Sequence, residues 1–489
     1  MTAEEAVVCL REALRNLEEG AAHQPGRPPG ISEIFAPQEH AAALDPERSL
    51  IVGNRGVGKT FWSSALVDNT ARNHIAKLPV YSRLNLGNVE AASGYDGGYS
   101  GAVAVSRDVI DAAQKAGAKP RRIWEAVLLR HLAPRVGRRF DQTIVQLALW
   151  LQDNVEESEE LLRKIDNYFF QNGKRFLIVF DALDTLGVSW SEVRPPLQGL
   201  IEFSRLAKSL RAIKPKIFLR VDQAQDRDLW TSPDASKLYN ERVRLSWSQY
   251  ALYELLFFHL TRGSEPKEAF AVLTKRSWKP RNFSHEDHRR AFTAIAGAYM
   301  GGGEKRGNTY DWVTNHLADA DSETTPRAFL VTLKAAAENH PASRPGVIDH
   351  LDIQVGVVRA SEGRIRELEE DYWWIRTAFK PLEGISVPCL PGDFDERWRG
   401  AETVEKIRSL ATGEKKLPPL AFEVPRVALD SSEGENTDER RLRVSLEIIG
   451  VLESRSNGKI NVPDIFRIAA RIKRRGGVKP PPPSRRTSS

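Results

Sequence analysis

The stretch SLIVGNRGVGKT, residues 49–60, contains the most informative pattern in the sequence. A short, mostly apolar run, SLIV, leads into the pattern G-x-x-x-x-G-K-T, and apolar residues at helical spacing follow it. In a strand, loop and helix of this kind, backbone N–H groups and the positive end of the helix dipole bind phosphate oxygens. The stretch therefore predicts a phosphate-binding loop and a bound nucleotide.

The side chains of this loop predict ATP and Mg²⁺ as the cofactors. Lys59 would reach the β- and γ-phosphates, and Thr60 would give its hydroxyl to Mg²⁺, which needs oxygen ligands. A chance glycine turn is the alternative, but it would not require the flanking strand and helix. The predicted nucleotide-binding residues are Gly53, Asn54, Arg55, Gly56, Val57, Gly58, Lys59 and Thr60.

A second apolar run ends in an acid. In FLIVFDALD, residues 176–184, Asp181 follows the run directly and Asp184 comes three residues later. An acid at a strand end beside a phosphate loop holds Mg²⁺, so we expect Asp181 to help hold the metal ion. Asp184 either orients the attacking water or caps the next helix, and Ala182 stands directly after Asp181.

A third apolar run, KIFLRVDQ, residues 216–223, predicts a strand with Arg220 near its end. In parallel sheets, ligands bind beyond the carboxyl ends of the strands. We therefore interpret Arg220 as a sensor of the γ-phosphate, with Asp222 as a weaker candidate for that position. The alternative is that Arg220 only solvates an exposed strand end.

A proline marks the start of a later helix in TPRAFL, residues 325–330. Pro326 suits the first turn of a helix, and Arg327 then lies in that turn, where a positive charge opposes the helix dipole. This placement is favourable if Arg327 faces an anion in a neighbouring domain. An ordinary surface arginine is the alternative.

The order of apolar runs predicts an α/β fold: a parallel sheet with helices on both faces, followed by a helical lid and a C-terminal winged-helix-like module. Expected strands lie at 49–52, 78–84, 176–180 and 216–221. The expected divisions are an N-terminal helix and linker (1–29), a nucleotide-binding core (30–240), a helical lid (241–345), a mixed connector (346–435), a winged-helix-like module (436–478) and a disordered basic tail (479–489).

Taken together, these motifs resemble the additional-strand P-loop ATPases of the AAA+ and STAND groups over about residues 30–340. The sequence DALD, which stands in place of the common pair of adjacent acids, resembles STAND-like and KAP-like members more than unfoldases. The resemblance implies slow or regulated ATP hydrolysis, with Lys59 at the phosphates, Asp181 at Mg²⁺, and Arg220 and Arg327 as sensors. Asp184 completes the set of candidate catalytic residues, and the resemblance leaves open whether it is the catalytic base. It also implies a homo-oligomeric switch that controls a separate effector in bacterial signalling or antiviral defence. Arg205 or Arg211 could act across a subunit interface or lie on a solvated helix surface.

The distribution of charge along the chain adds an alternative function. The 489 residues carry a net charge of +6, but residues 467–489 contain eight basic residues and no acid, so the rest of the chain is close to neutral. This end and the expected module at 441–472 favour a DNA-binding ATPase resembling origin-recognition proteins as the alternative. A third reading is a scaffold that binds ATP without turnover.

The cysteine count and the apolar runs predict a cytoplasmic protein. The two cysteines exclude a disulfide framework and form no metal-ligand pair. The first 20 residues lack the pattern of a secretory signal, and no apolar run reaches the length of a membrane helix.

Overall fold

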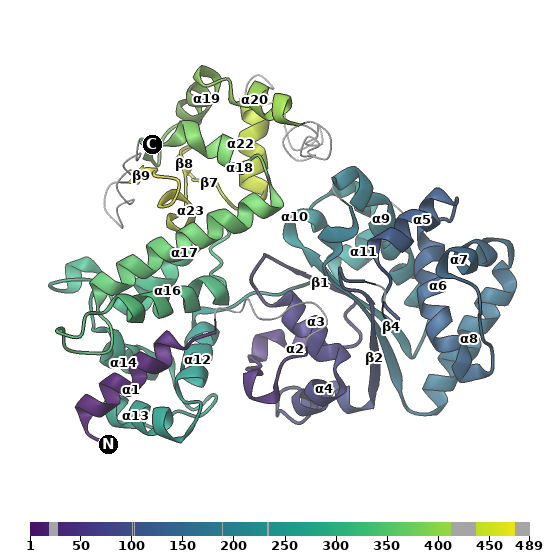
Figure 1. Ribbon diagram of the computed structural model, residues 1–489, viewed down its shortest axis with the longest axis horizontal. Coiled ribbons are helices and arrows are strands. Elements are labelled where there is room, and N and C mark those ends of the chain that lie inside the picture. The colour runs from purple at the N-terminus through teal and green to yellow at the C-terminus, as the bar shows by residue number, and fades with distance from the viewer. Residues whose placement is uncertain are drawn as a thin grey trace, which may run out of the picture. The chain divides into compact units, whose positions relative to one another are not determined.

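The computed structural model describes residues 1–18, 28–99, 101, 103–187, 189–231, 234–411 and 437–474. The chain divides into two units, His23–Ser246 and Met1–Ala22 with Trp247–Ser489. The first unit contains a parallel sheet, and the second is mostly helical (Figure 1).

Among the described residues of the first unit, five parallel strands form a sheet in the order β2-β3-β4-β1-β5. In this order β4 lies between the strand before the glycine loop and the strand before Asp181. Gly53 is the register partner of Arg220, so two of the predicted site residues end adjacent strands. The strands are β1 Leu50–Gly53, β2 Val89–Tyr95, β3 Arg175–Phe180, β4 Ile213–Arg220 and β5 Val243–Arg244.

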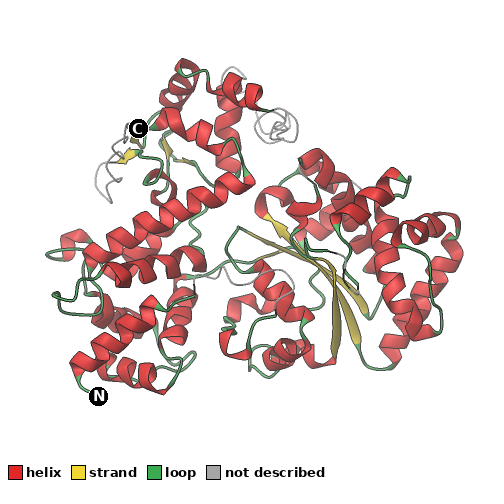
Figure 2. Cartoon of the chain, viewed as in Figure 1, coloured by secondary structure: helices red, strands yellow, loops and turns green. Residues whose placement is uncertain are grey.

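Helices cover both faces of this sheet (Figure 2). Helix α3 packs on β2 and β3 from one side, and α6, α8 and α9 pack on the sheet from the other. The arrangement confirms the expected α/β fold of the P-loop ATPases. The helices are α2 Ala41–Leu44, α3 Lys59–Val67, α4 Asn69–Ala76, α5 Arg107–Lys115, α6 Pro120–Leu132, α7 Ile144–Asp153, α8 Val155–Gln171, α9 Trp190–Ala207, α10 Val221–Ala224 and α11 Ala235–Asn240.

The prediction of a strand at 78–84 is wrong. These residues form turns and a short 3₁₀ helix, Ser82–Leu84, and the Tyr81 hydroxyl donates to the Pro37 carbonyl at 2.6 Å. Pro79 has no N–H to give to a strand ladder, and Asn85 adopts a left-handed conformation with φ of 52°. The second strand of the sheet begins later, at Val89.

The second unit begins with helix α1, which packs against α13 and α16, far from it in sequence. Ala6, Leu10 and Leu14 of α1 are fully buried. We call residues 247–371 the helical subdomain. Its helices are α12 Gln249–Leu260, α13 Ser264–Thr274, α14 His285–Ala296, α15 Thr309–Leu317, α16 Pro326–Asn339 and α17 His350–Asp371, and α1 spans Ala3–Arg15.

We call residues 375–411 and 437–474 the C-terminal module. Helix α19 packs on α22, where Arg443 and Asp395 form an ion pair at 2.6 Å, and β6 pairs with β9. A turn at Asn457-Gly458 lies between β7 and β8. The winged-helix assignment stays a prediction. Its elements are α18 Ile375–Phe379, β6 Ser386–Val387, α19 Pro391–Gly400, α20 Thr403–Leu410, α22 Asp438–Ile448, β7 Glu453–Ser454, β8 Ile460–Asn461, α23 Asp464–Arg467 and β9 Lys473–Arg474.

Part of the basic charge at the carboxyl end lies inside this module. Arg467 is fully buried and forms an ion pair with Asp464 at 2.5 Å. Arg471 pairs with Glu383, and Arg474 pairs with Asp464. The expected tail at 479–489 lies outside the described residues. Within the described ranges, no helix combines the length and apolar character needed to cross a membrane.

Candidate nucleotide-binding site

The glycine loop turns the chain from β1 into α3. Gly56 and Gly58 have φ of 83° and 101°, a left-handed conformation that favours glycine. A Cβ on Gly53 would lie 2.7 Å from the Val57 side chain and 3.1 Å from the Leu245 carbonyl oxygen, so this position also requires glycine. The loop therefore delivers the chain to the N-terminus of a nine-residue helix, the geometry that suits a phosphate.

Lys59, the first residue of α3, is held by its own loop. Its Nζ donates to the Gly53 and Asn54 carbonyl oxygens at 2.9 and 3.0 Å. Burial lowers the pKa of Lys59 to about 8, and the positive charge of Arg220 acts in the same direction. Such a half-buried ammonium group gains from a nearby anion, which fits a phosphate ligand.

Asp181 directly follows β3 and lies beside Thr60, as the motif spacing predicts. Its side chain is buried, and Oδ2 accepts a hydrogen bond from the Ser63 hydroxyl of α3 at 2.9 Å. Burial raises the pKa of Asp181, while hydrogen bonds from the Ala182 backbone and from the Ser63 and Thr60 hydroxyls oppose that shift. The donor set consists of oxygen atoms, which fits Mg²⁺.

Arg220 joins two acids at the end of β4. Its guanidinium donates to both carboxylate oxygens of Asp222, at 3.0 and 3.2 Å, and lies 3.6 Å from Asp184. The Arg220 side chain is only 13% exposed, so it does more than solvate a strand end. Asp184 lies within a 3₁₀ helix, Leu183–Leu186, and Ser189 is the N-cap of the next α-helix.

The structure adds one acid that the sequence analysis missed. Asp96 follows β2 and lines a cavity of about 310 Å³ together with Thr60, Ser63 and Asp181. The Tyr95 hydroxyl lies 2.8 Å from the Thr185 hydroxyl, which links this loop to the turn after Asp181. An acid directly after a strand is a recognisable signal, but here the strand itself was not predicted.

The other predicted arginines lie on other helices, and partners are seen for two of them. Arg327, near the start of α16 in the second unit, forms an ion pair with Glu367 of α17 at 2.6 Å. Arg211 donates to the Asn167 side chain and lies over the Phe170 ring, 4.0 Å from its centroid. Arg205 lies in the last turn of α9. The structure thus brings together Lys59, Thr60, Asp181, Asp184 and Arg220.

Comparisons with known proteins give only weak similarities. No protein-family model matches the chain, and no curated protein matches it. A Walker-type ATPase of Pyrococcus abyssi aligns with a TM-score of 0.41 at 13% identity, covering 93% of this chain and all of that one. The ORC2 protein of Aeropyrum pernix, in ADPNP–ADP complexes, aligns with a TM-score of 0.36 at 11% identity, covering 88% and 89%.

The ORC1 protein of Aeropyrum pernix in complex with DNA aligns with a TM-score of 0.32 at 12% identity, covering 90% of this chain and 92% of that one. Similarities at these scores do not support an argument about activity. The fold class rests instead on the strand order and on the glycine loop.

Proposed function

We propose that the unit His23–Ser246 binds ATP with Mg²⁺ and hydrolyses it, and that this reaction drives a molecular switch. The observation that carries the proposal is that Asp181 and Arg220 follow or end the adjacent strands β3 and β4, while Lys59 of α3 donates to the last residue of the neighbouring strand β1. Lys59 would bind the phosphates, and Thr60 and Asp181 would hold Mg²⁺. The metal ion would supply charge neutralisation on the phosphate oxygens.

Phosphoryl transfer depends mainly on positioning and charge stabilisation, so the remaining residues need to face the γ-phosphate. Arg220 supplies a positive charge that Asp222 holds in place. We assign the orientation of the attacking water to Asp184, because it lies 3.6 Å from Arg220 and, unlike Asp222, does not form the paired hydrogen bonds that hold Arg220. Asp96 is the competing candidate, because it shares a cavity with Thr60 and Asp181.

The switch role adds a partner to this chemistry. We infer a homo-oligomer whose nucleotide-dependent assembly controls a separate effector, with Arg327 as a sensor from the helical subdomain. The resemblance of the motifs to STAND-like and KAP-like ATPases supports this inference and favours slow or regulated turnover. Signalling or antiviral defence is the setting that the same resemblance suggests.

The test measures phosphate release and molecular mass. Wild type should release phosphate from ATP in the presence of Mg²⁺, and Lys59→Ala should abolish release by removing the phosphate contact. Light scattering after size-exclusion chromatography should show a larger species with ATP for wild type only. Equal phosphate release by wild type and Lys59→Ala would refute hydrolysis at this site. ATP binding without phosphate release would favour the alternative of a scaffold that binds ATP without turnover. A molecular mass that does not change with ATP would refute nucleotide-dependent assembly.

The DNA-binding alternative depends on the basic carboxyl end. Arg467, Arg471 and Arg474 are already in ion pairs within the C-terminal module, which reduces the charge free to contact phosphates. DNA binding that is lost on deletion of residues 475–489 and weakens steeply with salt would support this alternative.

A further inference from the structure

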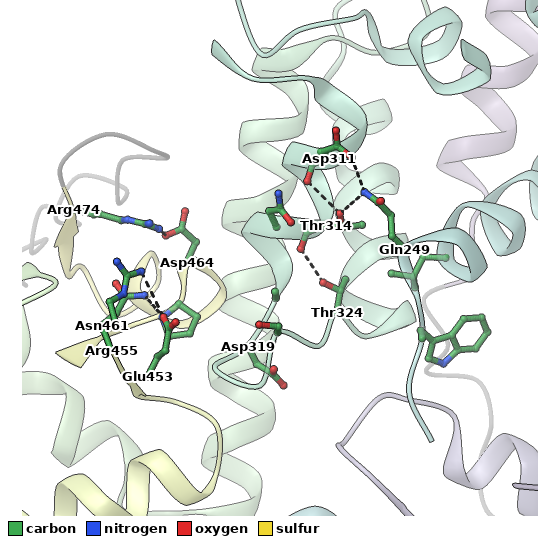
Figure 3. Close-up of a pocket in the computed structure, with 16 residues that line it drawn as sticks. Gln249, Asp311, Thr314, Asp319, Thr324, Glu453, Arg455, Asn461, Asp464 and Arg474 are labelled. Carbon is green, nitrogen blue, oxygen red and sulfur yellow. Dashed lines mark hydrogen bonds and ion pairs between the residues drawn. The ribbon is translucent and has the colours of Figure 1, made fainter. Parts of the chain in front are cut away.

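A second cavity lies within the mostly helical unit, and its described lining includes none of the residues assigned above. Its volume is about 430 Å³. Figure 3 shows Gln249, Asp311 and Asp319 of the helical subdomain along one wall. Segment 453–474 of the C-terminal module forms the opposite wall. The two parts already touch, because the Ala320 N–H donates to the Gly450 carbonyl at 3.1 Å.

Among the described lining residues of this cavity, acidic side chains outnumber basic ones. Four carboxylates line it, compared with two guanidinium groups. Burial raises the pKa of Asp319 to about 6; the charge of Glu323 and Asp321 adds to that shift, while Arg364 and the Glu323 backbone N–H oppose it. A carboxylate in this position gains from a cationic ligand. The charged lining residues are Asp311, Asp319, Glu453, Asp464, Arg455 and Arg474.

Two buried acceptors on the C-terminal wall lack hydrogen-bond donors among the described residues. Asn461 is 3% exposed; its Nδ2 donates to Glu453 at 2.8 Å, but its Oδ1 has no hydrogen-bond partner. Oδ2 of Asp464, also 3% exposed, accepts no hydrogen bond, and His316 Nε2 lies 3.6 Å away. A buried polar atom without a partner is unfavourable, so both atoms indicate a donor supplied by a ligand.

The spacing of the acids argues against a chelated metal ion. Within the described ranges, one group of three His, Asp or Glu side chains brings its ligand atoms within 4.8 Å of one another, and it lies elsewhere, at His340, Asp349 and Asp352. Arg344 already pairs with both acids of that group. Acceptors spread over two walls of a cavity suit a ligand with several separated donors.

We propose that this cavity binds a small organic cation with several N–H donors, such as a guanidinium compound or a polyamine. One end of the ligand would donate to Asn461 and Asp464, and the other would pair with Asp319 on the facing wall. Binding would then link the C-terminal module to the helical subdomain.

The test uses the full chain and isothermal titration calorimetry, with agmatine and spermidine as probes. Asp319→Asn keeps the shape of the side chain but removes its charge, and we expect at least a tenfold rise in Kd, as for a lost charge-assisted hydrogen bond. Asp321→Asn makes the same charge change on the same loop outside the cavity lining, and should leave Kd within about twofold of wild type.

Sodium chloride and magnesium chloride at matched ionic strength serve as controls for general charge screening. The absence of heat with both probes at millimolar concentration would overturn the proposal. Equal weakening in Asp319→Asn and Asp321→Asn would also overturn it, because it would indicate attraction to surface charge. Circular dichroism of both variants confirms that a loss of binding does not come from unfolding.

Discussion

Lys59 connects the geometry of the loop to a pH dependence. Its pKa is lowered to about 8 by burial, so above that pH the ammonium loses its proton in the free protein. ATP needs the charged form, and binding should therefore take up a proton and weaken by about tenfold for each pH unit above 8. Calorimetry in two buffers of different ionisation enthalpy measures this uptake. In Lys59→Met the proton uptake should disappear. If the affinity of the wild-type protein for ATP did not change between pH 7 and 9.5, the prediction would be contradicted.

Asp184 and Asp96 can be separated by amide substitutions, which change the charge and keep the shape. We expect Asp184→Asn to slow phosphate release by about 100-fold, the effect of losing a residue that positions or deprotonates water. ATP binding should be retained, because Asp184 makes no predicted phosphate contact. Asp96→Asn is the matched variant and should release phosphate at close to the wild-type rate. The reverse pattern would assign the role to Asp96.

Most of the candidate site could be predicted from single residues. Lys59, Thr60, Asp181 and Arg220 each follow or precede a recognisable apolar run, and parallel strands bring their carboxyl ends to one edge. The pairing of Arg220 with both Asp222 and Asp184 could not be predicted, because it depends on side-chain directions at two strand ends. Asp96 was missed because its strand was missed.

The strands differ in how well the sequence pattern predicts them. β3 and β4 are buried along most of their length and contain apolar runs. β2, with the sequence VEAASGY, lies at the edge of the sheet and consists largely of small residues. β5 has only two residues, too few for any periodicity. The missed strands are therefore those at the two edges of the sheet.

Strand β4 contains a buried lysine with a structural role. Lys216 is fully buried, and its Nζ donates to the carbonyl oxygens of Ala43, Asp45 and Arg48 at 3.0, 2.6 and 2.6 Å. Lys216→Met would leave these acceptors without a donor, so we expect the free energy of unfolding to fall by about 3 kcal/mol in urea titrations.

Lys208 provides the control for this prediction. It forms an exposed ion pair with Glu241, and its side chain is 36% exposed. Lys208→Met should change the free energy of unfolding by less than about 1 kcal/mol. A similar loss in the two variants would indicate that the carbonyl contacts of Lys216 contribute little.

At the scale of the whole molecule, the chain leaves and re-enters the mostly helical unit. Helix α1 belongs with residues more than 200 positions away, whereas the residues that follow it build the sheet. The sequence pattern marks α1 as amphipathic, but it does not identify the surface that covers its apolar side. Long-range pairing of this kind depends on shape complementarity that no local pattern contains.

The two units should therefore respond to different perturbations in a calorimetric melt. ATP at about 100 times its Kd should stabilise the unit with the glycine loop by about 2.7 kcal/mol and raise its transition temperature. Leu10 of α1 is fully buried. The cavity left by Leu10→Ala should lower the free energy of unfolding of the mostly helical unit by about 3 kcal/mol, and should lower the transition temperature of that unit only. Val8→Ala, at a position 62% exposed, is the control. If Leu10→Ala lowered the ATP-sensitive transition instead, the stability of the nucleotide-binding unit would depend on α1, and the division into two units would not describe how the chain unfolds.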